Sequence, residues 1–588
     1  MILNALCDYY DLLSTVENSE ISPCGFQTVT ANYAAILLED GVLQDIISLN
    51  QLNNKQPQVF TTPIRLKMPG IAASPVCDNF DYIFGVGGEK GKKEISEEKF
   101  ATAKVLHQQM FKDAVSTEAI AIKNFFESWD INKAWENENI LKHYSEKGKS
   151  FSGNIVFRLM GSEKYFHQNN EIINIWLDHN EKTKQIEGST IAQCSVTGKN
   201  LPIARIHKQF SGVNGASTMG ASLVCFKKDA DKSYGFEQSR NSAVSESVAF
   251  KYGTALQYML SNKEQKVLIG DATTVFWAGK IDDSYIKVFN CLLTDPDEPD
   301  DESIVEDIKT RETVKSILQD GINGVYNNTA LDPETNFYVL GLSPNAGRIS
   351  VRFFYRNSFA SFCEKIKQHY DDITIYGGKN GRQHIKIGSL LYATISSKSK
   401  DKKINPLLGG AVARAILTGE MYPQILLNQT IIRVKVEAEI TQPRAAIIKG
   451  YLVRKNRLLK KEEELTMSIN EESKNPAYVL GRIFAILEII QKNAYEGTIN
   501  ATIKDKYFAS ACSNPSLVFP SLLKLAQHHL AKIKGNYWNI QLGECIGLLE
   551  GDCFPKILNM ENQGRFILGY YQQNQKNYET RQEIKEVK

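Results

Sequence analysis

The spacing of apolar residues changes along this chain and predicts two regions of different secondary structure. Before about residue 400, apolar runs with a period of two indicate strands. Two hairpins are predicted there, at 33–49 around Asp40-Gly41 and at 337–354 around the turn-rich segment 343–347. Between them lie helical patterns at 97–111, 118–129 and 245–260, and single strands at 155–159 and 221–226. Because these elements lack the regular spacing of βαβ units, we expect an α+β fold with a mixed or antiparallel sheet.

From about Asn405 onward the apolar period becomes 3.6, which is typical of amphipathic helices. Helices are predicted to begin at Asn475-Pro476 and Asn514-Pro515, since an amide acceptor followed by proline suits a helix N-terminus. Two further patterns, at 538–549 and 560–573, complete a set of four that can bury every apolar stripe. The predicted domains are an α+β domain at 1–400, a basic helical connector at 401–466 and an all-α four-helix bundle at 467–588.

Composition agrees with a folded, multidomain protein of 588 residues, with 42% hydrophobic and 23% charged residues. No apolar run approaches the roughly 20 residues that span a bilayer, and the first residues lack the basic segment of a secretory signal. We therefore expect a cytoplasmic protein without a membrane partner. Ten cysteines occur singly and no CxxC pair exists, which favours reduced thiols over structural zinc.

The motifs of common catalytic sites are missing from the sequence. Lysines that follow Gly91 and Gly148 lack the first glycine of a phosphate-binding Walker loop. The nine histidines are dispersed, and no GxSxG motif occurs. We predict no catalytic residue, no metal and no cofactor.

The net charge of +2 conceals a strong asymmetry. Residues 341–461 contain 22 Lys and Arg against 7 Asp and Glu, whereas residues 295–334 contain 12 acids against 3 bases. Dense positive charge is self-repelling unless anions neutralise it, and nucleic-acid phosphates are a common long anion. A solvated basic face that the acidic segment balances is the alternative. The predicted phosphate contacts are Lys90, Lys92, Lys93, Lys208, Arg348, Arg352, Arg356, Arg444, Lys449, Arg454, Lys455 and Arg457.

Several stretches, in order along nearly the whole chain, resemble one protein family. They include ILNALCDYYDLL, CDNFDYIFG, CSVTGKNLPIARIHKQFSGVNGASTMGAS, GDATTVFWA, SPNAGRISVRFF, AILTGEMYP and AYVLGRIFAILEIIQ. In these stretches the sequence resembles the large subunit of the type I-C CRISPR surveillance complex, Cascade.

The resemblance implies a non-enzymatic role in RNA-guided recognition of DNA. Pairing with CRISPR RNA reads the target strand, while this subunit recognises the short protospacer-adjacent motif in duplex DNA. It also promotes strand separation and R-loop formation and helps recruit the helicase-nuclease. The implied partners are CRISPR RNA, double-stranded target DNA with its displaced strand, the backbone and crRNA-end subunits of Cascade, and a small subunit identical to the chain's own C-terminal region.

Given that role, two loops rich in small polar residues, 70–79 and 211–222, are predicted to read the motif. Hydroxyl and amide groups reach base edges, whereas nearby lysines position the backbone. The predicted base contacts are Ser74, Asn79, Asn214, Ser217 and Thr218.

Met467 is predicted to be an internal translation start. A product beginning there would contain 122 residues and the whole predicted bundle. The upstream Lys461-Glu462-Glu463 admits a purine-rich codon run suited to a ribosome-binding site. The family resemblance implies a small subunit made in this way, and an ordinary linker methionine is the alternative.

Two other function classes stay open on sequence grounds. A nuclease with an unrecognised carboxylate site would cleave nucleic acid with Mg²⁺. An RNA-processing or packaging scaffold would bind RNA as tightly as duplex DNA.

Overall fold

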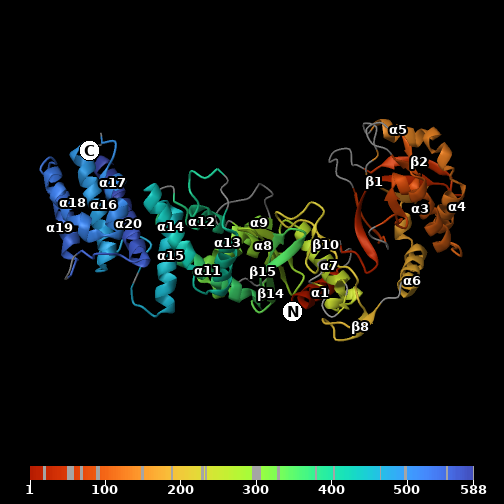
Figure 1. Cartoon of the computed structure of the whole chain (residues 1–588), viewed down its shortest axis with the longest axis horizontal. Helices are drawn as coiled ribbons and strands as arrows, with labels where there is room; N and C mark the ends of the chain where they lie inside the picture. The colour runs from red at the N-terminus through yellow and green to blue at the C-terminus, as the bar shows by residue number, and fades with distance from the viewer. Residues whose placement is uncertain are drawn as a thin grey trace. The chain divides into compact units, whose positions relative to one another are not determined.

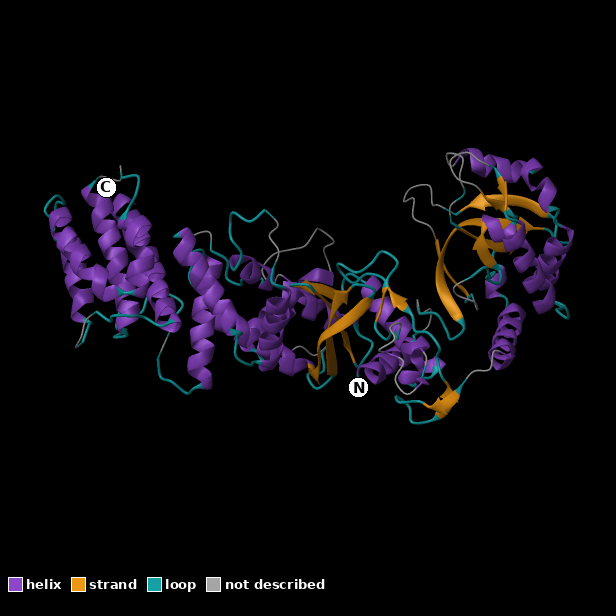
Figure 2. Ribbon diagram, in the orientation of Figure 1, coloured by secondary structure: helices purple, strands orange, loops and turns teal. Residues whose placement is uncertain are grey.

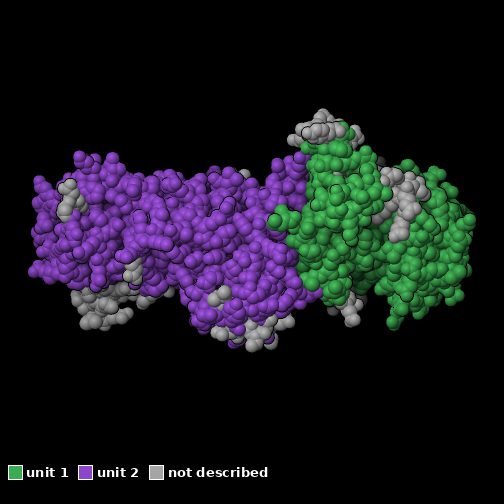
Figure 3. Space-filling model, turned by 90° about the horizontal axis from the view of Figure 1, so that it is seen from below, with its two compact units in different colours: residues 1–208, 224–258 green, residues 209–223, 259–588 purple. Residues whose placement is uncertain are grey.

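The computed structural model describes residues 1–16, 21–49, 58–65, 70–87, 93–146, 151, 153–186, 190–226, 231, 235–236, 238–294, 306–327, 331–377, 381–400, 404–463, 465–495, 499–550 and 554–586. The chain forms two compact units (Figure 3). Unit 1 comprises Met1–Lys208 and Val224–Tyr258, and unit 2 comprises Gln209–Leu223 and Met259–Lys588. The predicted boundaries at residues 400 and 467 both fall within unit 2.

Unit 1 contains a five-stranded mixed sheet centred on β1 (Phe26–Leu37). This strand pairs antiparallel with β2 (Leu43–Ser48) and β3 (Gln58–Pro63) and parallel with β7 (Asn154–Leu159), which pairs antiparallel with β4 (Cys77–Asn79). The predicted hairpin around Asp40-Gly41 is confirmed. Gly41 has a φ of +92°, and a Cβ there would lie 2.6 Å from the Ala121 carbonyl oxygen, so this turn requires glycine.

Helices pack against this sheet (Figure 1). Together they bury a core rich in aromatic side chains, including Phe80, Phe125 and Trp176. The helices are α2 (Phe80–Ile83), α3 (Glu97–Met110), α4 (Thr117–Ser128), η1 (Ile131–Glu136), α5 (Glu138–Glu146), η2 (Phe166–Gln168) and α6 (Asn170–Ile186). The short strand pairs are β5 (Val86–Gly87) with β6 (Glu94–Ile95) and β8 (Ile191–Gln193) with β9 (Asn200–Pro202). α1 (Ile2–Leu13) contacts α7 (Glu246–Ser261) through Tyr10 and Phe250, and η5 (Gln238–Asn241) precedes α7.

Unit 2 contains a six-stranded sheet in the order β10-β11-β15-β14-β13-β12. Its strands are β10 (Gln209–Phe210), β11 (Ala221–Ser222), β12 (Lys266–Ile269), β13 (Ala272–Ala278), β14 (Asn336–Asn345) and β15 (Arg348–Ser358). The predicted hairpin at 337–354 is confirmed as β14 and β15. α8 (Asp283–Thr294), α9 (Glu306–Asp320), α10 (Ile322–Asn327) and α11 (Phe359–Ile373) share a hydrophobic core with this sheet, in which Phe289, Phe337 and Phe362 meet.

The described residues after 404 are helical, as predicted from the change in period (Figure 2). The helices from 387 onward are α12 (Ile387–Ala393), α13 (Pro406–Thr418), α14 (Gln424–Glu437), α15 (Gln442–Leu458), α16 (Pro476–Ala494), α17 (Ile503–Ser513), α18 (Pro515–Leu530), α19 (Tyr537–Gly547) and α20 (Met560–Glu586). α16 and α20 approach closely, because a Cβ on Gly481 would lie only 2.0 Å from the Phe566 carbonyl oxygen.

The described part of 467–588 thus has five helices where four were predicted. The additional helix, α17, buries Ile503, Phe508, Ala511 and Cys512. The gap of five positions after Ile503 breaks the apolar stripe, so periodicity missed this helix. Its start carries a capping box in which Thr502 and Asp505 bond each other's backbone, a pattern that is visible in the sequence. Asn475 caps α16 as predicted, whereas the Asn514 side chain makes no cap bond to α18.

Among the described residues, no helix is both long and apolar enough to cross a membrane. The same residues contain no group of three or more His, Cys, Asp or Glu arranged to hold a metal ion.

Candidate nucleic-acid interface

Three of the five basic residues of α15 are buried rather than exposed to solvent. Arg454 is 0% exposed, and Arg444 and Lys449 are each 4% exposed. A phosphate contact requires an accessible donor, which these three side chains lack. Their burial corrects the prediction that Arg444, Lys449 and Arg454 bind nucleic-acid phosphates.

Asp372, near the end of α11, neutralises two of the α15 arginines. Arg454 Nε lies 2.9 Å from Asp372 Oδ2, and Arg457 donates to both carboxylate oxygens at 2.6 and 2.9 Å. Arg454 also donates to the Ala415 carbonyl at 2.7 Å, and its guanidinium lies 3.9 Å from the centroid of the Tyr422 ring. Removing one partner of such a buried pair leaves an uncompensated charge, so loss of either residue would destabilise the packing of α11 against α15.

The remaining basic groups of α15 also have partners within unit 2. Arg444 pairs with Glu437 at 2.5 Å, and Lys449 donates to the Asp372 carbonyl at 3.0 Å. Lys455 pairs with Glu561 of α20. Lys455 and Arg457 keep 31% and 38% of their side-chain surface exposed, so phosphate binding by these two stays a prediction.

The loop between β10 and β11 presents its polar side chains outward. Asn214, Ser217 and Thr218 are all exposed, as base contacts would require. The loop backbone is held by hydrogen bonds from Ala216 N to the Val213 carbonyl (3.1 Å) and from Gly220 N to the Ser217 carbonyl (2.9 Å). The described conformation is therefore a pair of consecutive turns rather than an extended strand.

The same loop displays Met219, which sequence reasoning missed. Its side chain is 86% exposed, which is unusual for a large apolar residue far from the chain termini. A large apolar residue among small polar neighbours is the feature of the sequence that could have identified Met219. Apolar side chains of this kind can insert between base steps of a duplex.

The fold brings this loop beside two of the predicted arginines. β11 pairs parallel with β15 at Ser222 and Arg348, and Ser222 N donates to the Gly347 carbonyl at 3.1 Å. Asn214 N donates to Thr273 Oγ1 of β13 at 2.9 Å. Two residues away from Thr273, Asp271 accepts from Arg352 at 2.9 Å.

We define the loop–arginine surface as Asn214, Ser217, Thr218, Met219, Arg348 and Arg352, all in unit 2. The exposed Arg356 lies further along β15, where Asn336 holds it at 3.2 Å and its guanidinium is 5.7 Å from the Tyr338 ring centroid. Groups suited to base edges and groups suited to phosphates are thus close together on one sheet.

The other predicted reading loop, 70–79, belongs to unit 1 and is built differently. Ser74 is 4% exposed and its backbone N–H donates to Asp78 at 2.8 Å, so burial corrects its prediction as a base contact. The half-buried Asn79 caps α2 by accepting from Asp81 N (3.1 Å) and Tyr82 N (3.4 Å). Its carboxamide oxygen is therefore engaged in local structure.

The predicted lysines of unit 1 divide into described and undescribed positions. Lys93 is exposed with its ammonium 5.1 Å from the Trp135 ring centroid, and Lys208 is exposed. Lys90 and Lys92 lie outside the described residues.

Met467, the predicted internal start, lies in unit 2. Its side chain is 51% exposed, and its carbonyl accepts from Tyr376 N at 3.1 Å.

Comparison with protein families decides the class of this protein. A family described as CRISPR-associated protein (Cas_Csd1) matches residues 6–578. The chain belongs to the Cas_Csd1 family. It is thus a CRISPR-associated protein, as the resemblance implied in part. A comparison with curated proteins finds no significant match.

Proposed function

We propose that this Cas_Csd1 protein is the non-catalytic large subunit of a type I-C Cascade complex in the cytoplasm. It recognises the adjacent motif in duplex DNA, promotes strand separation and R-loop formation, and helps recruit the helicase-nuclease. CRISPR RNA and the other Cascade subunits are its partners. The observation that carries this proposal is the loop–arginine surface, where exposed amide and hydroxyl groups lie beside arginines.

The chemistry of that surface suits duplex recognition. Short side chains such as Asn214 and Ser217 can hydrogen-bond base edges, while Arg348 and Arg352 contact the phosphates on either side. Arg352 is already oriented by Asp271, which lowers the cost of fixing its geometry on binding. The family match supports a place in a CRISPR system.

The test compares two duplexes bound by the reconstituted RNA-guided complex, one with the correct adjacent motif and one with an altered motif. The motif is first selected from a library with randomised flanks. The double variant Asn214→Ala/Ser217→Ala is expected to reduce discrimination by about 1–3 kcal/mol for each lost base contact.

Arg348→Ala is the matched control, because loss of a phosphate contact weakens both duplexes equally. Equal loss on both duplexes with the double variant would show that Asn214 and Ser217 only position the DNA. Mg²⁺-dependent cleavage by the purified chain would instead favour a nuclease, and equally tight RNA binding would favour a scaffold.

The C-terminal region is also proposed to serve as the separate small subunit, translated from Met467. α16 and α20 pack through Phe484, Phe566 and Tyr570, a core contained in such a product. Gly564 of α20 is covered in the full chain by Ile448 and Leu427, which the product lacks. In that product, the surface of α20 around Gly564 would therefore be uncovered and could contact another subunit.

The internal start is tested by synonymous recoding of codons 461–463 together with Met467→Leu. The 122-residue fragment should disappear while full-length chain persists. Absence of any such fragment from cells with the native gene would contradict the proposal.

A further inference from the structure

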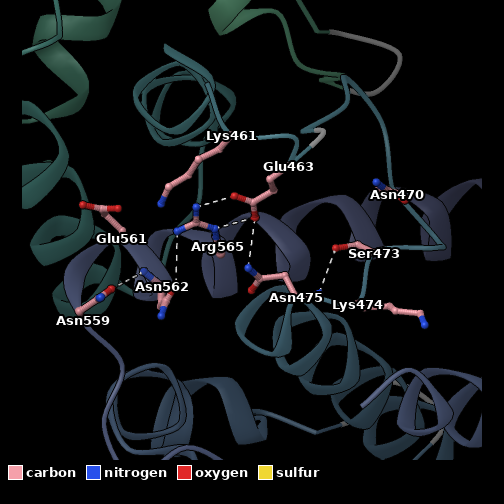
Figure 4. Close-up of a pocket in the computed structure, with 10 residues that line it drawn as sticks. All are labelled: Lys461, Glu463, Asn470, Ser473, Lys474, Asn475, Asn559, Glu561, Asn562 and Arg565. Carbon is pink, nitrogen blue, oxygen red and sulfur yellow. Dashed lines mark hydrogen bonds and ion pairs between the residues drawn. The ribbon is translucent and has the colours of Figure 1, made fainter. Parts of the chain in front are cut away.

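A polar cavity of about 590 Å³ lies within unit 2, where the end of α15, the start of α16 and the start of α20 meet (Figure 4). Its volume falls within the roughly 300–1,000 Å³ typical of small-molecule sites. Of the residues that the structure describes, those lining the cavity have charged, amide or hydroxyl side chains, and none is aromatic. A ligand here would be held by hydrogen bonds and charge rather than by stacking.

The carboxylates of the cavity are already neutralised. Glu463 accepts two bonds from Arg565, at 2.7 and 2.5 Å, and one each from Asn456 (2.9 Å) and Asn475 (3.2 Å). Burial alone would raise the pKa of Glu463, but the hydrogen bonds and charge of Arg565 hold it below its usual value. Glu561 is paired with Lys455.

Donors, by contrast, stay available. Figure 4 shows the Lys461 side chain extending into the space beside Arg565. Among the described residues, the Lys461 ammonium makes no hydrogen bond or ion pair, although its charge helps to lower the pKa of Glu463. Asn559 and Asn562 use their carboxamide oxygens to accept from Asn562 N (2.9 Å) and Arg565 (3.3 Å), which leaves their NH₂ groups open.

We propose that this cavity binds a phosphate group of a nucleotide through Lys461, Asn559 and Asn562. Surplus donors around neutralised carboxylates complement an anion rich in acceptor oxygens. The cavity volume leaves room for the attached sugar and base. Binding through the phosphate does not depend on base identity, because every nucleotide carries the same phosphate group. The ligand is the backbone of single-stranded nucleic acid, which rests on the proposed function, or a free nucleotide of the same chemistry.

The site exists only in the full-length chain. A product starting at Met467 would lack Lys461 and Glu463, and with them the free ammonium and the acceptor that orients Arg565. The full-length chain and the small subunit would therefore differ in this binding property.

The test measures binding of a fluorescent single-stranded oligothymidylate to the full-length chain by anisotropy. Lys461→Glu and Asn562→Asp should each raise the Kd about tenfold, since each removes a donor and adds negative charge. Asn562→Asp preserves the acceptor oxygen that Arg565 uses, so the local fold is retained. Lys524→Glu, an exposed position on α18, makes the same charge change as Lys461→Glu outside the cavity.

Competition then separates the two sources of phosphate. Displacement by AMP at concentrations below those needed for inorganic phosphate assigns the site to free nucleotide, and displacement only by oligonucleotide assigns it to a strand. Equal Kd values for Lys461→Glu, Asn562→Asp and Lys524→Glu would overturn the proposal. This assay uses no duplex, so its failure leaves motif discrimination by the loop variants as a separate result.

Discussion

The two basic regions of unit 2 differ in the solvent exposure of their side chains. α15 carries the denser positive charge, yet Arg444, Lys449 and Arg454 are buried against carboxylates and carbonyls. The loop–arginine surface has only two arginines but exposes its polar side chains. A high density of Lys and Arg along a sequence therefore does not reveal whether these side chains are exposed or buried. An acidic partner from a distant segment can bury them.

The largest effect is expected from breaking the buried ion pairs around Asp372. Arg454→Ala should lower the free energy of unfolding by about 3–5 kcal/mol, because it removes a buried partner of Asp372. Chemical denaturation measures this change. If the free energy of unfolding falls by less than about 1 kcal/mol and DNA binding weakens, Arg454 contacts phosphate rather than forming a buried ion pair.

A second prediction concerns the pH dependence of the same cluster. Burial, assisted by the charge of Arg454, lowers the pKa of His369 well below 6.5, so the folded state keeps this imidazole neutral. Below pH 6.5 the His369 imidazole binds a proton in the unfolded chain but not in the folded chain. The free energy of unfolding therefore falls as the pH falls.

His369→Gln should remove this contribution, about 2 kcal/mol between pH 7 and pH 5. Denaturation of both proteins at the two pH values measures it. An identical loss of stability in wild type and variant would show that His369 is not held neutral by the fold.

A smaller effect is expected at the tip of the loop–arginine surface. Met219→Ser should weaken duplex binding by about 1.5 kcal/mol, through lost burial of apolar area. Because this contact carries no charge, the dependence of affinity on salt should stay unchanged. Titrations at several salt concentrations check both parts, and unaltered affinity would exclude Met219 from the interface.

The elements that the sequence predicted well depend on local rules. Gly41 marks a tight turn, and Asn475 caps a helix, because neighbours within a few positions determine both. The family assignment likewise drew on short stretches spread along the chain.

The failures depend on long-range pairing. Arg454 meets Asp372 across 82 positions, a contact that no periodicity reveals. The neighbourhood of Asn214 and Arg348 depends on β11 pairing with β15. Ser74 looked like an exposed loop residue, but Asp78 and Arg65 form an ion pair that anchors its segment. Charge and polarity were visible in the sequence, whereas their accessibility was not.

The most direct test of the central claim, that the loop–arginine surface rather than α15 contacts the DNA, is the salt dependence of duplex binding. Arg348→Ala is compared with Lys455→Ala, each in the reconstituted complex, by plotting log Kd against log salt. We predict that Arg348→Ala reduces the slope by about one unit and that Lys455→Ala reduces it by less, because the Lys455 ammonium is already paired with Glu561. A reduced slope for Lys455→Ala with an unchanged slope for Arg348→Ala would contradict the account.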